Sequence, residues 1–144
     1  MSNVRRVSPA DAHSLLSEGY TYVDVRSEPE FAAGRPVGSI NVPLLHAGPG
    51  GMAPNPEFLA VMEGAFAKDA KLVVGCKAGG RSLRAAETLL AAGFTGVVDQ
   101  RAGFDGSGGP FGGGEAGWRA SGLPTDAGDA PGRSYADVKA RGAH

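Results

Sequence analysis

Short apolar runs rich in β-branched residues alternate with segments of helical periodicity along most of this chain. The runs Tyr20–Val25, Leu72–Val74 and Gly96–Asp99 each predict a strand. In the segment Arg81–Ala92 apolar residues recur at helical spacing, and Gly93 is placed to end that helix. Strands that alternate with helices across short turns predict an α/β fold, with a parallel sheet covered by helices on both faces.

Weaker signals complete the predicted order of elements. Val4–Val7 and Ser39–Val42 predict two further strands, so we expect a parallel five-stranded sheet. Helix starts are predicted by a capping residue close to a proline, at Ser8, Ser27 and Asn55. The less regular segments are expected to form a loop (Leu44–Pro54), a short closing helix (Trp118–Leu123) and a marginal helix (Ser134–Arg141).

Glycine and proline are unevenly distributed and divide the chain. They make up 34 of the 144 residues, 24 Gly and 10 Pro, which is about twice the usual share. Glycine alone occupies eight of the fifteen residues from Gly103 to Gly117, which predicts a surface loop rather than a packed element. We therefore expect one domain over residues 1–124, with the glycine-rich loop 103–117 within it, and a polar C-terminal tail over residues 125–144.

The charge balance and the cysteine count exclude several classes of protein. With 14 Lys+Arg against 15 Asp+Glu, the formal net charge is -1, so no basic footprint for nucleic acid or an anionic membrane is present. A single cysteine excludes a disulfide framework and a multi-cysteine metal cluster. No apolar run approaches ~18 residues and the first residues carry no secretory signal, so a cytoplasmic location is expected.

The turn after the most apolar strand carries the most reactive side chain. Its sequence, Gly75–Ser82, places Cys76 at the end of a buried strand and starts a helix near Arg81. In parallel sheets, ligands bind at the carboxyl ends of strands, next to helix N-termini. The two glycines allow backbone N–H groups to point inward as a nest that stabilises an anion, and Arg81 adds a planar fork of donors. A buried structural cysteine needs no such nest, so the pattern favours Cys76 as a nucleophile in a partly open site.

This loop is one of several motifs that occur together in a fixed order. Asp24-Val25-Arg26 with Glu30-Phe31 comes first, followed by Gly38-Ser39-Ile40-Asn41-Val42-Pro43, the Cys-x-x-x-x-Arg-Ser loop, and Gly93-Phe94 with Val97. Together they resemble the rhodanese family of sulfurtransferases, and the single-domain members from plants and bacteria most of all. The similarity runs from about Val4 to Pro124, where Gly122-Leu123-Pro124 resembles the usual family ending. Two features depart from the family pattern: Arg35 stands where many relatives have histidine, and the stretch from Gly103 to Gly117 is longer than the usual connection.

The resemblance implies a single-domain, rhodanese-like sulfurtransferase that needs neither a cofactor nor a metal. Cys76 would take a sulfane sulfur from a small anionic donor, such as thiosulfate or a persulfide, and become a persulfide itself. A thiol, including a protein thiol, or cyanide would then remove that sulfur. The resemblance assigns binding of the persulfide and the donor to Lys77, Ala78, Gly79, Gly80, Arg81 and Ser82. In this set, Arg81 would anchor the loop and bind the anionic donor.

Other interpretations of the same loop remain open. The phosphatase and arsenate reductase version of this fold uses a loop one residue longer, whereas four residues separate Cys76 from Arg81, and the smaller loop favours a sulfur atom over a tetrahedral oxyanion. A carrier or protein-interaction module of the same fold would hold sulfur without turnover. The loop also differs from a nucleotide-binding P-loop in its missing lysine. A Cys–His protease would need a histidine beside Cys76, from among His13, His46 and His144.

Overall fold

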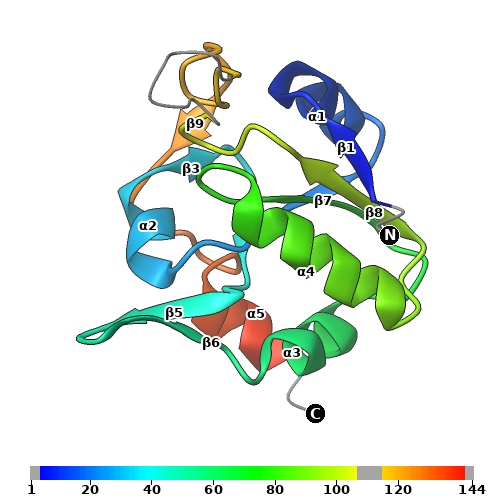
Figure 1. Cartoon of the computed structure of the whole chain (residues 1–144), viewed down its shortest axis with the longest axis vertical. Helices are drawn as coiled ribbons and strands as arrows, with labels where there is room; N and C mark the ends of the chain where they lie inside the picture. Colours follow the sequence, from blue (N-terminus) through cyan, green and yellow to red (C-terminus); the bar gives the residue numbers. More distant parts are fainter. Residues whose placement is uncertain (1–3, 107–114, 142–144) are drawn as a thin grey trace.

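The computed structural model describes residues 4–106 and 115–141, in which helices and strands alternate except that four strands follow one another between residues 35 and 54 and two between residues 96 and 126 (Figure 1). In chain order, the elements are β1 (Arg5–Val7), α1 (Pro9–Leu16), β2 (Thr21–Asp24), α2 (Glu28–Ala33), β3 (Arg35–Pro36), β4 (Ile40–Asn41), β5 (Leu45–Gly48), β6 (Gly51–Pro54), α3 (Phe58–Ala65), β7 (Lys71–Gly75), α4 (Gly80–Ala91), β8 (Gly96–Gln100), β9 (Thr125–Asp126) and α5 (Tyr135–Arg141). Two helices start at their predicted caps: the Ser8 side chain accepts a hydrogen bond from the Asp11 N–H, and Ser27 forms a capping box with Glu30. The cap predicted at Asn55 was wrong, because α3 begins at Phe58 with Glu57 as its N-cap, and the Asn55 side chain accepts from the Glu57 N–H in the turn before it.

One parallel sheet of five strands organises the fold, in the order β1-β8-β7-β2-β4. The central strand β7 pairs with β2 on one side and β8 on the other, so that Val74 lies beside Val23 and Asp99. Helix α1 covers one face of the sheet, while α3, α4 and α5 cover the other (Figure 1). The predicted α/β fold, with a parallel five-stranded sheet and helices on both faces, is confirmed.

Alternate residues of the central strand enter two separate hydrophobic clusters, because successive side chains of a strand point to opposite faces of the sheet. Leu72 and Val74 pack in the cluster that includes α3, α4 and α5, whereas Val73 packs with α1 and Trp118. All three side chains are fully buried. The strand that leads to Cys76 is therefore held on both faces and positions the turn that follows it.

The segment predicted as a loop, Leu44–Pro54, forms a hairpin instead. β5 and β6 pair antiparallel from Leu45 opposite Pro54 to Gly48 opposite Gly51. The prediction was wrong because β6 is exposed throughout and β5 is at most partly buried. Such strands lack the alternation of apolar and polar residues that marks a half-buried strand in a sequence.

The segment Trp118–Leu123 does not form the short helix expected of it but consecutive turns. The Trp118 side chain is 1% exposed, its ring packs edge-on against those of His13 and Tyr22, and its Nε1 donates to the Pro124 carbonyl at 2.8 Å. The tryptophan therefore anchors this segment in the α1 cluster without helical structure. The middle of the predicted glycine-rich loop, residues 107–114, lies outside the described residues.

Residues 125–141 pack against the rest of the fold. β9 pairs with β3, and α5 contributes Tyr135 and Val138 to the larger hydrophobic cluster. The helix predicted at the end of the chain is thus confirmed, with Val138 fully buried. The domain boundary at residue 124 stays a prediction, but the described part of the predicted tail contributes to the core. Across residues 4–106 and 115–141, none of the helices has both the length and the apolar character needed to cross a bilayer.

Arg35, which departs from the family pattern, holds this C-terminal segment. Its side chain is fully buried, and its guanidinium donates to the carbonyls of Phe31 (3.1 Å), Gly128 (2.8 Å) and Asp129 (3.1 Å). It also forms an ion pair with Asp126 at 3.3 Å. Three of these partners belong to residues 126–129 and the fourth, Phe31, belongs to α2. The Arg35 side chain therefore holds residues 126–129 against α2.

Candidate active site

Cys76 follows β7 directly and lies at the carboxyl edge of the sheet. It is the free cysteine of this chain, and it is 2% exposed. The expectation of a partly open site is therefore wrong, because the sulfur packs among the residues of the larger hydrophobic cluster.

Two groups of the loop contact the Cys76 sulfur. The backbone N–H of Gly79 donates to Sγ at 3.1 Å, and the Ser82 hydroxyl lies 3.5 Å from Sγ. Helix α4 begins at Gly80, so the N–H groups of its first turn have no partner within the helix and the positive end of its dipole faces the loop. This arrangement stabilises negative charge on a sulfur atom.

The curl of the loop depends on Gly79. Its φ is +99°, and a Cβ at this position would lie 2.2 Å from the carbonyl oxygen of Arg101. Gly80 has a φ outside the left-handed region and open space where a Cβ would be. Of the two glycines expected to shape the nest, one is therefore required for its geometry.

The Arg81 side chain forms an ion pair with Glu30, which lies in α2. Its guanidinium makes two hydrogen bonds to the Glu30 carboxylate, at 2.7 and 3.0 Å, and so joins the start of α4 to α2. The same carboxylate accepts from the backbone N–H and the hydroxyl of Ser27. Although burial raises the pKa of Glu30, the hydrogen bonds from Arg81 and Ser27 prevail and lower it to about 2. The role predicted for Arg81 in binding a donor stays a prediction.

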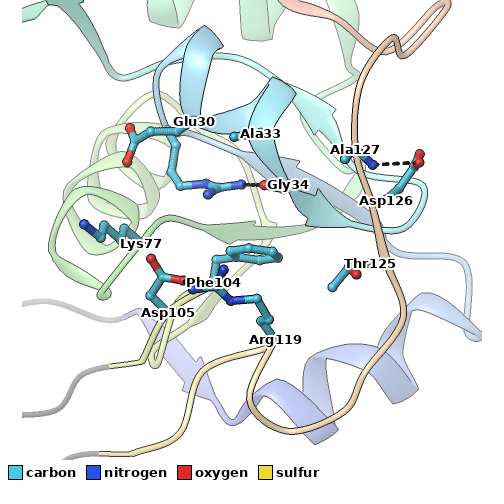
Figure 2. A pocket seen from close by; sticks show the side chains of 11 residues that line it. Glu30, Ala33, Gly34, Lys77, Phe104, Asp105, Arg119, Thr125, Asp126 and Ala127 are labelled. Atoms are coloured by element: carbon cyan, nitrogen blue, oxygen red, sulfur yellow. Dashed lines mark hydrogen bonds and ion pairs between the residues drawn. The ribbon is translucent and has the colours of Figure 1, made fainter.

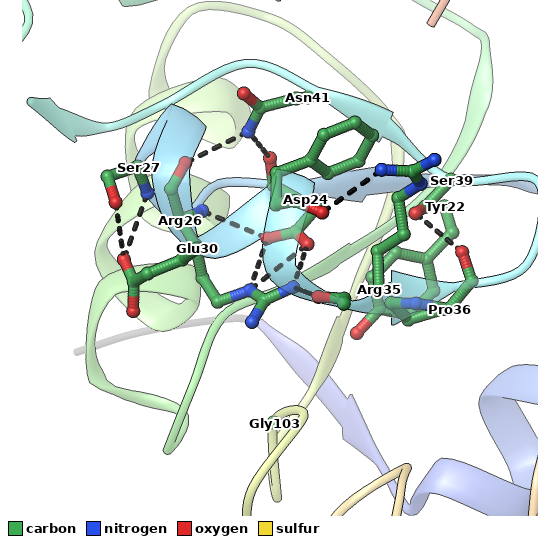
Figure 3. A network of polar contacts seen from close by, with 12 residues as sticks. Tyr22, Asp24, Arg26, Ser27, Glu30, Arg35, Pro36, Ser39, Asn41 and Gly103 are labelled. Carbon is green, nitrogen blue, oxygen red and sulfur yellow. Dashed lines mark hydrogen bonds and ion pairs between the residues drawn. The ribbon is translucent and has the colours of Figure 1, made fainter. Parts of the chain in front are cut away.

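A buried ion pair supports the loop from the neighbouring strand. Asp24, at the end of β2, accepts hydrogen bonds from the Arg26 backbone N–H and from its guanidinium, the shortest at 2.7 Å (Figure 3). The guanidinium also donates to the Gly34 carbonyl, and the Asn41 amide donates to the carbonyls of Asp24 and Arg26. Burial raises the pKa of Asp24, and its hydrogen bonds from Arg26 oppose that shift. This network fixes the side chains of Asp24 and Arg26, the two charged residues of the motif Asp24-Val25-Arg26, at the edge of the sheet.

The segment after β8 lies along the loop. The Phe104 N–H donates to the Cys76 carbonyl at 2.7 Å, and the Asp105 N–H donates to the Lys77 carbonyl at 3.0 Å. The described start of the glycine-rich stretch therefore forms one wall of the candidate site. This contact was not predicted, because nothing local in the sequence indicates where a chain leaving β8 will run.

A cleft of about 600 Å³ opens beside this wall (Figure 2). The Phe104 ring forms part of its lining, with the Arg26 guanidinium 4.6 Å and the Arg119 guanidinium 5.4 Å from the ring centroid. The Lys77 side chain also lines the cleft, near Asp105 in Figure 2. Its residues are Arg26, Glu30, Ala33, Gly34, Lys77, Phe104, Asp105, Arg119, Thr125, Asp126 and Ala127.

Lys77 differs from the other cations of this cleft. Arg26 is paired with Asp24, and Arg119 with Asp105. Within the part of the chain that the structure describes, the Lys77 ammonium has no acidic partner. Lys77 is therefore the cation here with a charge available for a ligand.

The predicted site residues thus divide into groups. Cys76, Gly79 and Ser82 are buried and in mutual contact, while Arg81 points away to Glu30. The three exposed members of the loop are Lys77, Ala78 and Gly80. Two further residues beside the loop were not predicted, Arg6 and Asp99. The signal for Asp99 was its place at the carboxyl end of the strand next to Cys76.

The described histidines do not form a pair with Cys76. The His13 ring packs against Trp118, and the His46 ring packs against Tyr135, on the two opposite clusters. His144 lies outside the described residues. The geometry required for a Cys–His protease is therefore not present at either described histidine.

In class, the molecule is thus an α/β domain whose central parallel strand ends at a cysteine, and the sulfur of that cysteine accepts a hydrogen bond from a backbone N–H at the start of a helix. The chain belongs to the family described as "Rhodanese-like domain", whose model matches residues 8–107. It is 43% identical over 121 residues to "Thiosulfate sulfurtransferase 16, chloroplastic" from Arabidopsis thaliana, covering 84% of this chain and 92% of the relative. It is 40% identical over 93 residues to "Rhodanese-like domain-containing protein 15, chloroplastic" from the same plant, covering 65% of this chain and about half, 51%, of that relative.

A solved structure supports the same assignment. The crystal structure of Rv0390 from M. tuberculosis has a TM-score of 0.73 and 30% sequence identity, and the match covers 88% of this chain and all of that one, 100%. The resemblance to single-domain rhodanese-family members is thus confirmed. The two plant relatives are named as chloroplast proteins, and they do not support the cytoplasmic location expected from the sequence.

Proposed function

We propose that this chain is a sulfurtransferase that moves a sulfane sulfur from thiosulfate or a persulfide donor to a thiol or to cyanide, with Cys76 as the carrier of the sulfur. The observation that carries the proposal is the hydrogen bond of 3.1 Å from the Gly79 N–H to the Cys76 sulfur, at the start of α4. A relative named thiosulfate sulfurtransferase, similar over 84% of this chain, supports the same reaction.

The first half of the reaction would load Cys76. Its thiolate attacks the outer sulfur of thiosulfate, so that an S–S bond forms to Sγ while the bond between the two thiosulfate sulfurs breaks. Sulfite leaves with the electron pair of that bond, and Cys76 becomes a persulfide. The Gly79 N–H and the first turn of α4 stabilise the negative charge that develops on the sulfur.

The second half would discharge the persulfide. A thiolate or cyanide attacks the outer sulfur, and the Cys76 thiolate leaves with the electrons of the S–S bond. Because a covalent intermediate separates the two halves, we expect ping-pong kinetics. Neither half needs a metal or an organic cofactor.

The cleft beside the loop would bind the donor and the acceptor. Lys77 would attract the sulfonate group of thiosulfate, since its ammonium forms no ion pair with the acidic side chains of residues 4–106 and 115–141. Arg81 would act chiefly as a brace that fixes the loop on α2, since Glu30 holds both ends of its guanidinium. Gly79, Gly80 and Ser82 would supply the N–H and hydroxyl donors around the sulfur, with Ala78 at the tip of the loop.

The test is the intact mass of the reduced protein after brief incubation with thiosulfate, with Cys76→Ser as the matched variant. We expect the mass of one added sulfur in the wild type, absent from Cys76→Ser and removed by cyanide. The variant keeps nearly the same side-chain volume, so its circular dichroism spectrum should match that of the wild type.

Two results would speak against the proposal. A wild type that gains no sulfur from thiosulfate or a low-molecular-weight persulfide would favour a carrier with a dedicated protein donor or oxyanion chemistry, and arsenate and aryl-phosphate assays would distinguish these. Sulfur addition that persists in Cys76→Ser would exclude Cys76 as the carrier.

A further inference from the structure

A second cleft, of about 480 Å³, lies on the face of α2 opposite the candidate active site. Residues 30, 33 and 34 line the active-site cleft, whereas residues 28, 31 and 32 line the second one. A shift of two residues turns a helix face by about 200°, so α2 separates the two clefts. The other walls of the second cleft come from β4 and from residues 128–137.

The charged side chains that line this second cleft are all acidic. They are Glu28, Asp129 and Asp137, each of them exposed at its rim. One oxygen of Asp137 accepts the Gly132 N–H at 2.8 Å, but none of the three carboxylates forms an ion pair within residues 4–106 and 115–141. The three carboxylates of the active-site cleft, in contrast, are each paired with an arginine.

Three cations on the neighbouring segments are turned to other partners. Arg35 and Arg133 both pair with Asp126, and Lys139 pairs with Glu57. None of these cations lines the second cleft. A ligand in this cleft would therefore meet the carboxylates without competition from a basic side chain of the described chain.

The floor of the cleft contains a buried amide with an unsatisfied oxygen. Asn41, in β4, lines the cleft and is 1% exposed. Its Nδ2 donates to the carbonyls of Asp24 and Arg26, at 3.0 and 2.9 Å, which fixes the end of the amide that carries the oxygen (Figure 3). Oδ1 accepts no hydrogen bond from the described residues. The negative end of the amide dipole is thus uncompensated in a region of low dielectric constant, which favours a positive charge above it.

The lining favours an organic cation over a metal ion. Among the described residues, no three Asp, Glu, His or Cys side chains are grouped as a metal site requires. Much of the remaining lining is apolar and includes Phe31, Ala130, Pro131 and the ring of Tyr135. A cation with an alkyl stem fits both parts, because the stem packs on apolar surface while the charged head reaches the acceptors. A guanidinium offers five N–H donors in a planar fork, which suits carboxylates on separate segments better than an ammonium does.

We propose that this cleft binds an alkylguanidinium group, whose N–H groups donate to the carboxylates of Glu28, Asp129 and Asp137 while its charge lies above the Asn41 carbonyl. The group belongs either to a small molecule or to an arginine side chain of a protein partner, and the chemistry of recognition is the same for both. The site goes beyond the proposed sulfur transfer and does not depend on it, since the acidic rim would repel an anionic sulfur donor.

The direct test is a titration of the ¹⁵N-labelled wild type with n-butylguanidinium at low salt, followed by ¹H–¹⁵N NMR spectra. We expect saturable shifts in backbone amides of residues 28–32 and 128–137 and in the side-chain amide of Asn41, with a dissociation constant of about 1–5 mM. The side-chain amide of Gln100, which donates to Gly103 on the active-site side, should not shift. An absence of saturable shifts at the second cleft, or equal shifts beside carboxylates all over the surface, would overturn the proposal.

The matched variant is Asp129→Asn, because the Asp129 carboxylate is exposed and its loss leaves the buried contacts of Arg35 with the backbone in place. We expect the dissociation constant to rise about fivefold. Asp69→Asn, which removes an exposed carboxylate before β7, should change it by less than about 1.5-fold. An unchanged dissociation constant in Asp129→Asn would overturn the assignment of the rim carboxylates.

Two further ligands test the chemistry of the site. Because n-butylammonium lacks the planar fork, it should bind at least about threefold more weakly than n-butylguanidinium. Equal binding of the two would overturn the choice of a guanidinium. Calcium chloride that shifts the same resonances more than sodium chloride of equal ionic strength would overturn the proposal in favour of a metal site.

The source of the group is distinguished with the capped peptide acetyl-Gly-Arg-Gly amide. A peptide that binds at least about fivefold more tightly than n-butylguanidinium supports an arginine of a protein partner, because neighbouring peptide groups then add contacts. Equal or weaker binding of the peptide supports a small molecule as the occupant of the same site.

Discussion

Glu30 and Arg81 are 51 positions apart in the sequence, yet they form a two-point ion pair at 2.7 and 3.0 Å that joins α2 to the start of α4. The geometry is bidentate, and the Ser27 N–H and hydroxyl complete the donors around the carboxylate. Since α4 begins with the residues that surround the Cys76 sulfur, this pair sets where the loop lies relative to the sheet edge.

Replacing Glu30 with glutamine should reduce stability in a pH-dependent manner. The pKa of Glu30 is about 2 in the folded chain and about 4.3 when unperturbed, so the carboxylate stabilises the fold above about pH 4.3 and loses that contribution as the pH falls toward 2. With a discount for its partial exposure, we expect Glu30→Gln to lower the free energy of unfolding by about 1–2 kcal/mol at pH 7. Urea unfolding at pH 7, 4 and 2.5 measures the difference.

The matched control is Glu28→Gln, which neutralises an exposed carboxylate in the first turn of the same helix. It should change the free energy of unfolding by less than about 0.5 kcal/mol at pH 7. A wild-type advantage over Glu30→Gln that stays constant down to pH 2.5 would show that the ion pair with Arg81 is not its source.

Removing the charge of Lys77 should weaken the binding of the sulfur donor and have little effect on the stability of the fold. Lys77 lines the cleft without an acidic partner among the described residues, and a partly exposed charge contributes about 1 kcal/mol to binding an anion. Lys77→Met should therefore raise the KM for thiosulfate about fivefold, with little change in kcat. Arg84→Met removes an equal charge from the exposed face of α4 and serves as the control. If both variants raise the KM equally, the effect belongs to the net charge of the protein and not to the cleft.

Cys76 and the structure of its loop were predictable because their signals are local. A buried apolar strand, a cysteine, glycines and a helix start follow one another from Leu72 to Ser82, and parallel sheets place such turns at a binding edge. The partners of the loop were not predictable in the same way. Arg6 and Asp99 are 93 positions apart, and their contact depends on the pairing of β1 with β8, which no local pattern specifies.

Exposure and burial explain the other differences between the predicted and the observed structure. The hairpin of β5 and β6 was missed because an exposed hairpin carries no hydrophobic alternation. The C-terminal helix carries only two buried residues, Tyr135 and Val138, so its sequence is mostly polar and does not indicate that it packs on α3. Arg35 was noted as a departure from the family pattern, but its role as a clamp requires knowing that residues 126–129 return to α2.

Adding a methyl group at Gly79 should disrupt the loop, whereas adding one at Gly80 should not. An alanine at position 79 would have to keep a φ of +99° and place its Cβ 2.2 Å from a backbone oxygen of Arg101, so the loop must move. We expect Gly79→Ala to lower the sulfur-loading rate at least about tenfold and to destabilise the fold by about 2–4 kcal/mol. Gly80→Ala meets open space and should retain loading within about twofold. The intact-mass assay and urea unfolding measure both. Equal losses in the two variants would mean that glycine is needed for flexibility in this loop rather than for the left-handed turn at position 79.

Arg35→Lys should release the C-terminal segment from α2. The buried guanidinium makes three hydrogen bonds to backbone carbonyls and an ion pair with Asp126, and a lysine ammonium cannot span these acceptors with the same planar geometry. We expect a loss of about 2–4 kcal/mol in the free energy of unfolding, because buried acceptors lose their donors. Limited proteolysis should then cleave within residues 125–134 at least about tenfold faster than in the wild type.

Arg133→Lys is the matched control, since Arg133 is partly exposed and its two contacts, at 3.4 and 3.5 Å, are long. A contrary outcome is that, in Arg35→Lys, cleavage within residues 125–134 is no faster than global unfolding. The contacts of Arg35 would then belong to the main cooperative unit, and residues 125–141 would not unfold separately from the rest of the domain.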